Sequence, residues 1–282
     1  MRRARLSLLG LLAGCTASFD PPSFVAGLRV LAVKAEPPEV APGETTTLTV
    51  LDVDTDGRAI AISWFRCLVR PLPGSPVADD CVTGAQPDDL MSVGAGTPLA
   101  FTMPAATPGD LGLPDSTGGY FVPLLAHADT GADALTFGYR VRLATGGPRN
   151  HNPPLVSVAH DAPHPVGAAA GTPGEPLDES APLAIAAGQE VTLRAAFADD
   201  SAETYDVVIA GAPTRTVTEV LSFAWFATAG SFSEDVTSPD RPDTKLKLDK
   251  RVPPSGTTVD LWVVGRDERG GTDFLHRTLV VQ

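Results

Sequence analysis

Three carboxylates occupy alternate positions in the stretch LDVDTDGRAI, residues 51–60. They are Asp52, Asp54 and Asp56, and Gly57 follows the third at once. Oxygen ligands at alternate positions before a sharp glycine turn can wrap a hard cation such as Ca²⁺. Aspartate and glycine are also the ordinary residues of a polar turn between two strands. The residue types therefore leave two interpretations open, a calcium site and a turn without a ligand.

The segment resembles the start of an EF-hand calcium loop, but the match does not continue to the end of the loop. An EF-hand loop closes with a bidentate glutamate, and Ser63 stands at that position here. The flanking segments also alternate like strands rather than helices. Asp129 and Asp133 lie in a later turn, which a two-sheet sandwich would bring to the same end of the fold. The sequence therefore suggests no cofactor except possible calcium at this tip.

The segment HDAPH offers His160, Asp161 and His164 as candidate metal ligands. A structural zinc site needs a tetrahedral set of ligands, and this proline-interrupted segment has no helical face to present one. Solvated loop histidines are the favoured interpretation. The sequence also contains no nucleophile elbow, zinc-protease helix, phosphate-binding loop or dinucleotide glycine fingerprint. We therefore expect a protein that is not an enzyme, although a triad assembled only in the fold stays open.

Two cysteines, Cys67 and Cys81, enclose a proline- and glycine-rich stretch. Outside the cytosol two such thiols are expected to pair, and we predict a disulfide between them. The alternative is two free thiols.

The third cysteine, Cys15, ends the stretch LSLLGLLAGC, residues 6–15, which follows three arginines. A charged start, a short apolar run and small residues before a cleavage point make a secretory signal peptide. Its last four residues resemble the lipobox of bacterial lipoproteins. The resemblance implies cleavage after residues 1–14, lipidation of Cys15 and a lipidated tether over 15–26. By the same resemblance, Thr16 favours the outer membrane; an ordinary signal peptide is the alternative.

Composition agrees with an exported chain. The 282 residues carry a formal net charge of −13. Nucleic-acid binders neutralise phosphates with lysine and arginine, so we expect no nucleic acid as partner. Contact with the membrane is expected through the lipid anchor alone, with an envelope protein or a glycan as the further partner.

Short alternating segments bounded by 27 prolines and 27 glycines predict strands rather than helices. The segments also repeat in order. PGETTTLTV (42–50) matches AGQEVTLRA (187–195), and SWFRC (63–67) matches AWFAT (224–228). A third pair, 124–144 and 262–281, follows. Such a repeat indicates two copies of one fold.

Each copy carries a tryptophan, Trp64 or Trp225, where an immunoglobulin-like sandwich buries one on its third strand. The copies resemble bacterial immunoglobulin-like and PKD-like domains of surface lipoproteins. We therefore predict an all-β fold with two tandem immunoglobulin-like Greek-key sandwiches after the cleaved signal peptide. Domain 1 spans 27–145, a linker 146–152 and domain 2 153–282.

Domain 2 contains a long insertion after its first strand, residues 160–182, which is too rich in Pro, Gly and Ala to suggest a core. Long loops are usually functional or disordered. We therefore expect the partner contact on this loop, and a merely tolerated insertion is the alternative. The candidate contact residues are His160, Asp161, His164, Glu175, Asp178 and Glu179.

The function expected from these observations is a lipid-anchored, non-catalytic binding or scaffolding module of the cell envelope. A calcium-dependent adhesive or glycan-binding surface module is the first alternative, and an envelope hydrolase is the second.

Overall fold

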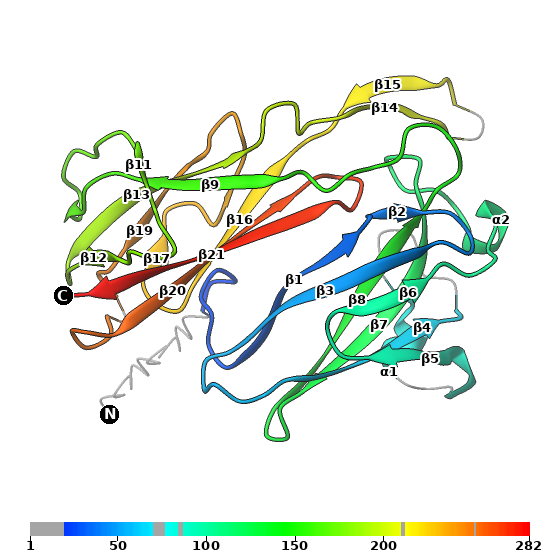
Figure 1. Cartoon of the computed structure of the whole chain (residues 1–282), viewed down its shortest axis with the longest axis horizontal. Coiled ribbons are helices and arrows are strands. Elements are labelled where there is room, and N and C mark those ends of the chain that lie inside the picture. The colour runs from blue at the N-terminus through cyan, green and yellow to red at the C-terminus, as the bar shows by residue number, and fades with distance from the viewer. Residues whose placement is uncertain (1–19, 70–76, 84–86, 210–211, 251) are drawn as a thin grey trace, which may run out of the picture.

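Strands make up nearly every element of the computed structural model, which describes residues 20–69, 77–83, 87–209, 212–250 and 252–282. Cys15 and its lipidation lie outside these ranges. No helix in the described ranges is long and apolar enough to cross a membrane. The two halves of the chain form two β-sandwiches that follow one another along the long axis (Figure 1).

Domain 1 packs a three-stranded sheet against a five-stranded sheet. The first sheet has the order β1-β3-β6, with β1 at Leu28–Glu36, β3 at Thr45–Asp54 and β6 at Leu99–Thr102. The second has the order β2-β8-β7-β4-β5, with β2 at Glu39–Val40, β8 at Ala134–Leu143, β7 at Tyr120–Asp129, β4 at Ala61–Cys67 and β5 at Leu90–Ala95. Short helices α1 (Asp79–Thr83), η1 (Pro87–Asp89) and α2 (Pro108–Leu111) lie in the connections.

Domain 2 repeats this strand order with additions. Its first sheet runs β11-β9-β13-β19-β17, with β11 at Glu175–Pro176, β9 at Leu155–His160, β13 at Gln189–Phe197, β19 at Asp243–Lys247 and β17 at Ser231–Phe232; β10 at His164–Pro165 also pairs with β13. Its second sheet runs β12-β21-β20-β16-β18, with β12 at Leu183–Ile185, β21 at Thr272–Val281, β20 at Thr258–Arg266, β16 at Ser222–Ala227 and β18 at Val236–Thr237. A separate hairpin joins β14 (Thr204–Val207) to β15 (Arg215–Thr218).

The two sandwiches share the details that define an immunoglobulin-like topology. In each domain the first strand is interrupted, and its second part pairs in parallel with the last strand, as β2 with β8 and β12 with β21. The remaining strand pairs are antiparallel, and several join strands that are not consecutive in the chain, such as β3 with β6 and β4 with β7, as in a Greek key. The predicted fold class is confirmed, and the three repeated segments fall on equivalent strands.

Both predicted core tryptophans are buried, with no exposed surface on Trp64 or Trp225. Each indole N–H has an acceptor: Trp64 Nε1 donates to the Gly96 carbonyl at 3.1 Å, and Trp225 Nε1 to Thr237 Oγ1 at 2.9 Å. A buried indole N–H needs such a partner, and each ring therefore packs in the core of its sandwich without leaving a buried donor unpaired.

The insertion 160–182 is part of the domain 2 sandwich, and the expectation that it adds nothing to a core is wrong. Its strands β10 and β11 pair with β13 and β9. Leu177 is only 2% exposed and belongs to the domain core, while its carbonyl accepts a hydrogen bond from Arg277 Nε at 2.6 Å. One apolar side chain and two short ladders are enough to fix a segment whose composition is typical of a loop.

Part of the expected tether is also fixed. The Val25 amide donates to the Ala227 carbonyl, and the Ala227 amide donates to the Ser23 carbonyl, both at 2.9 Å. The chain ahead of β1 therefore extends the edge of β16 in domain 2 before it enters domain 1. Val25 is 1% exposed and packs with Leu31 and Trp262, which joins the two domains through apolar contacts.

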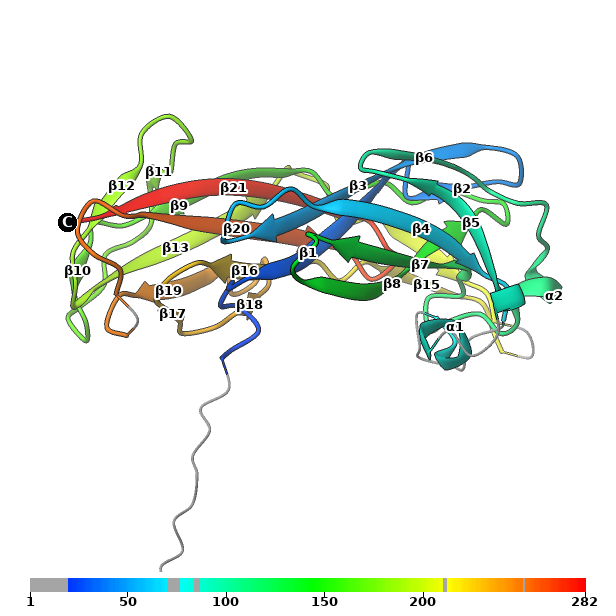
Figure 2. The same cartoon turned by 90° about the horizontal axis from the view of Figure 1, so that it is seen from below.

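The linker is held by polar contacts on both sides. The Arg149 guanidinium pairs with Glu44 of domain 1. Asn150 has no exposed surface; its amide donates to Glu39 of domain 1 and its side chain to Asp267 of domain 2. Figure 2 shows the two sandwiches one after the other along the long axis. The junction is therefore a built interface.

Candidate binding site between the two domains

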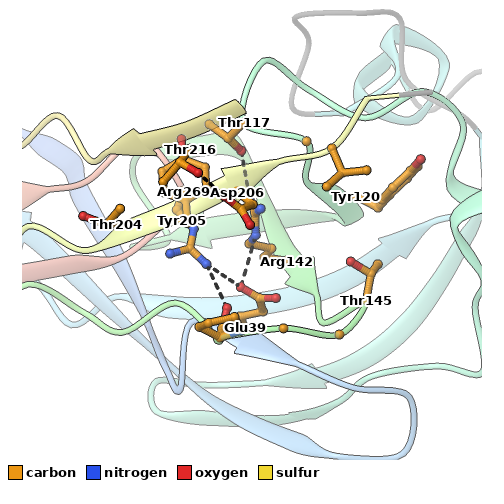
Figure 3. Close-up of a pocket in the computed structure, with 15 residues that line it drawn as sticks. Glu39, Thr117, Tyr120, Arg142, Thr145, Thr204, Tyr205, Asp206, Thr216 and Arg269 are labelled. Atoms are coloured by element: carbon orange, nitrogen blue, oxygen red, sulfur yellow. Dashed lines mark hydrogen bonds and ion pairs between the residues drawn. The ribbon is translucent and has the colours of Figure 1, made fainter. Parts of the chain in front are cut away.

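A cavity of about 840 Å³ lies at this junction, with walls from both domains (Figure 3). Its volume is within the range of about 300–1,000 Å³ that is usual for small-molecule sites. The lining side chains are mostly polar. The lining residues are Glu39, Thr117, Gly118, Tyr120, Arg142, Thr145, Gly146, Gly147, Pro148, Thr204, Tyr205, Asp206, Val208, Thr216 and Arg269.

The domain 2 wall is the β14–β15 hairpin, which reaches over the end of domain 1 (Figure 1). Its strands alternate so that Tyr205 and Val207 are buried while Thr204 and Asp206 are exposed. The Tyr205 hydroxyl donates to Glu268 Oε1 at 2.7 Å, and the Arg269 guanidinium lies over its ring, 4.5 Å from the centroid. These contacts fix the hairpin to the loop between β20 and β21.

The domain 1 wall is a tight turn at residues 115–119. Asp115 Oδ1 accepts hydrogen bonds from the amides of Thr117 and Gly119, at 2.9 and 3.0 Å. Arg142 Nη1 donates to Thr117 Oγ1 at 2.8 Å. A Cβ atom on Gly119 would clash with that Nη1 atom, so the absence of a side chain here lets the turn approach the guanidinium in its present position.

Two buried arginines share one carboxylate at the floor of the cavity. Glu39 Oε2 lies 3.2 Å from Arg142 Nε and 3.3 Å from Arg269 Nη2. The two arginine side chains are 8% and 3% exposed. Arg269 Nη1 also lies 3.2 Å from Glu219 and 3.3 Å from Glu203. The Nε atoms of both arginines are buried without a hydrogen-bond acceptor of suitable geometry.

Burial dominates the electrostatics behind this floor. It raises the pKa of Glu219 to about 7, and the nearby Asp267 and Glu203 charges add to the shift while the Glu203 amide and Arg269 oppose it. Burial also raises the pKa of Asp267 and lowers the pKa of Arg142. The junction is therefore a desolvated set of coupled charges, in which the ordinary preference of a carboxyl for ionisation is reduced.

Three of the five aspartates of the predicted calcium tip lie around the guanidinium of Arg58. Arg58 Nη2 lies 2.6 Å from Asp133 Oδ2 and 3.2 Å from Asp56 Oδ2, and Arg58 also pairs with Asp54. Hydrogen bonds from Arg58 lower the pKa of Asp54. Within the described ranges no three His, Cys, Asp or Glu side chains are grouped to hold a metal ion.

The other two aspartates of that prediction lie apart from the Arg58 contacts. Asp129 Oδ1 accepts from the Gly131 amide within its own turn. Asp52 lies inside β3, opposite Val30, and burial raises its pKa. The turn without a ligand is the interpretation that these contacts favour.

The predicted contact residues of the insertion differ in exposure: Asp161 is buried, whereas three acidic residues are exposed to solvent. Asp161 is 5% exposed, and its carboxylate accepts from the amides of Thr192 and Gly171 at 2.7 and 2.8 Å, so it holds the loop backbone. His164 lies close to it, with Nε2 3.4 Å from Asp161 Oδ2. His160 Nδ1 lies 2.7 Å from the Asp161 carbonyl. The exposed residues are Glu175, Asp178 and Glu179.

The predicted disulfide between Cys67 and Cys81 is confirmed. It joins the end of β4 to α1 and is buried with Val77, Ala78 and Leu125. The bond is therefore the centre of a small second core on the flank of domain 1.

Sequence reasoning missed the interdomain site. The alternation in TYDV and RTVT, residues 204–207 and 215–218, was available as a hairpin signal. Arg142 and Arg269 carried no such sequence signal, because their partners are remote in the chain: Glu39 and Arg269 are 230 positions apart.

No protein-family model matches this chain, and no curated protein matches it either. Among solved structures, it is similar to a chimeric titin Z1Z2 functionalized with a KLER exogenous peptide from decorin, at 13% identity and a TM-score of 0.21, over 91% of this chain and 97% of that one. It is also similar to the three N-terminal domains of the bacteriophage RB49 Highly Immunogenic Outer Capsid protein (Hoc), at 12% identity and a TM-score of 0.23, over 90% of this chain and 59% of that one. The immunoglobulin-like assignment rests on the strand order of this chain itself.

Proposed function

We propose that this chain is a lipid-anchored, non-catalytic binding module of the cell envelope, in which two immunoglobulin-like domains act as one unit. The observation that carries the proposal is the cavity that both domains build at their junction. A passive spacer needs no such cavity, and ligand sites occur preferentially between domains.

The fixed junction supports binding in a second way. The linker contacts both domains through Arg149 and Asn150, and Lys34 of β1 pairs with Asp273 of β21 at 2.9 Å. A site whose walls are already held in place loses less conformational entropy when a ligand binds. The cavity therefore has the preorganisation that a binding module requires.

Envelope location and anchoring rest on the sequence features. The signal-like segment ends at Cys15, and the Cys67–Cys81 disulfide is of the kind that persists in oxidising compartments. Several acyl chains on one residue give stable attachment, whereas a single chain gives only marginal binding. The outer membrane is the proposed location, with the protein held there by its lipid.

A palmitate analogue tests the anchor. Cells that express the wild-type chain should incorporate label into it, and cells that express Cys15→Ser should not. Cys67→Ser is the matched control and should still take up label, because it removes a cysteine that is buried in the fold and leaves Cys15 in place. Label retained in Cys15→Ser would contradict the anchor.

Crosslinking in the native envelope tests the binding role. The wild-type chain should yield a defined crosslinked partner or glycan, and an envelope in which the chain crosslinks to nothing would contradict the role.

A further inference from the structure

We infer that the cavity between the domains binds a neutral oligosaccharide. This inference rests on the proposed binding function and specifies the ligand class of that same site. Four features of the cavity carry it: its balance of charge, its hydroxyl groups, two buried arginine N–H groups and its mixed polar and apolar walls.

The charges that line the cavity cancel. Glu39 and Asp206 face Arg142 and Arg269. Glu39 already pairs with both guanidinium groups, so an anionic ligand would have to compete with a resident carboxylate. The whole chain carries a formal charge of −13, which repels anions further. A ligand without net charge meets neither obstacle.

Hydroxyl side chains are unusually frequent on the walls. Six of the fifteen lining residues carry one, and they are Thr117, Tyr120, Thr145, Thr204, Tyr205 and Thr216. A hydroxyl both donates and accepts hydrogen bonds, as the hydroxyls of a sugar do. Several are held in one orientation, since Thr216 Oγ1 donates to Asp206 Oδ1 and Thr117 Oγ1 donates to Asp115 Oδ1. The walls therefore offer a fixed pattern of acceptors and donors to a polyhydroxylated ligand.

The two arginines add buried donors whose hydrogen bonding within the protein is incomplete. Arg142 and Arg269 are 7% and 3% exposed, and both line the cavity. The Nε atom of Arg269 is buried without a hydrogen-bond partner, and the Nε atom of Arg142 faces only the Glu39 carboxylate, 3.2 Å away and without good hydrogen-bond geometry. Leaving a buried N–H unpaired is unfavourable, and native proteins rarely do so without a reason. Oxygen atoms of a bound sugar would supply acceptors to this pair of guanidinium groups.

Apolar surface lies beside these polar groups. Tyr120, Val208 and Pro148 belong to the lining, and Figure 3 shows the Tyr120 side chain across the cavity from the arginines. A sugar ring has C–H faces as well as hydroxyls, and a tyrosine offers an apolar ring with a polar end. The combination fits a saccharide better than a purely ionic ligand.

The test uses the full chain in detergent on an array of neutral and acidic oligosaccharides, followed by calorimetry with the strongest neutral glycan. Val208→Trp should weaken binding at least tenfold, because Val208 is 62% exposed at the cavity wall and a larger side chain there fills the space. Val156→Trp is the matched control: Val156 is 55% exposed on β9, away from the cavity, and its substitution should leave the affinity unchanged. Asp206→Asn, which keeps the shape but removes a charged acceptor, should also weaken binding.

Three results would overturn the inference: no neutral glycan bound on the array, a preference for acidic glycans, or equal affinity in the wild type and Val208→Trp. If the array is blank while envelope crosslinking still captures a partner protein, the binding function stands and the ligand class is wrong. If crosslinking also captures nothing, the proposed function fails as well.

Discussion

The same connection of the fold is built in two different ways in the two domains. Between β3 and β4 of domain 1 it is a short turn, residues 55–60, which contains Arg58 and one of its carboxylate partners, Asp56. Between β13 and β16 of domain 2 it is residues 198–221, and it contains the hairpin that forms a wall of the interdomain cavity. The strand order that the copies share makes the fold, and the segment in which they differ makes the candidate site.

The domain 1 connection contains Arg58, around which one carboxylate cluster forms, and the domain 2 connection contacts the Arg269 cluster through Glu203 and Glu219. The two clusters differ in burial. The Arg58 side chain is 26% exposed, whereas the Arg269 side chain is 3% exposed. Exposed ion pairs contribute little to stability, and removing one partner of a buried pair is costly because the other charge stays buried. The comparison therefore predicts that removing one partner from the junction cluster destabilises the fold far more than removing Arg58 from the tip.

The largest expected effect follows from breaking the junction. Arg269→Met leaves Glu39, Glu203 and Glu219 without their shared cation, and should lower the free energy of unfolding by about 3–5 kcal/mol. Urea denaturation measures it. Arg58→Met is the matched control and should shift the midpoint only slightly. Equal shifts in the two variants would show that burial does not distinguish the clusters.

The disulfide is the next difference between the copies. Domain 1 has Cys67 at the end of β4, and the matching position in domain 2 is Thr228. Closing a loop of this size should contribute about 3 kcal/mol in the chain-entropy account. The double variant Cys67→Ser, Cys81→Ser should lose that stability in domain 1 alone, which amide hydrogen exchange resolves domain by domain. Equal loss of protection in the domain 2 core would contradict the assignment.

A smaller effect concerns pH. The pKa of Glu219 is raised from 4.5 to about 7 in the folded chain, so between these values the folded state holds a proton that the unfolded state has released. The free energy of unfolding should therefore fall as the pH rises from about 4.5 to about 7, and this contribution should level off above that range. Asp267, whose pKa is also raised, acts in the same direction.

Melting temperatures between pH 4.5 and 8 measure this dependence. Glu219→Gln removes the titrating group, so its profile should be flatter than that of the wild type. Glu175→Gln, at an exposed position of the insertion, should leave the profile unchanged. A wild-type profile that rises with pH over this range would contradict the assignment.

Local and repeated features of the fold could be predicted from sequence. Strand alternation, the duplicated segments around Trp64 and Trp225 and the cysteine pair each depend on residues near one another or on a direct comparison of two segments. The buried position of Leu177 could not be predicted, because one leucine within a Pro- and Gly-rich stretch has no period. The contact of Glu39 with Arg269 could not be predicted either, since it exists only when the two domains pack together.

The smallest expected effect sharpens the comparison at the tip of domain 1. Arg58 contacts Asp54, Asp56 and Asp133, and a guanidinium between carboxylates occupies the place that a metal ion would need. Millimolar calcium should therefore produce no calorimetric heat and no rise in the melting temperature of the wild-type chain. In Arg58→Met the same three carboxylates lose their cation, and calcium, which prefers such oxygen ligands, should raise the melting temperature of that variant. The double variant Arg58→Met, Asp133→Asn is the control and should lose this response. A calcium response in the wild type would show that Arg58 does not close the tip and would favour the calcium-dependent adhesive, the first alternative, over the proposed function.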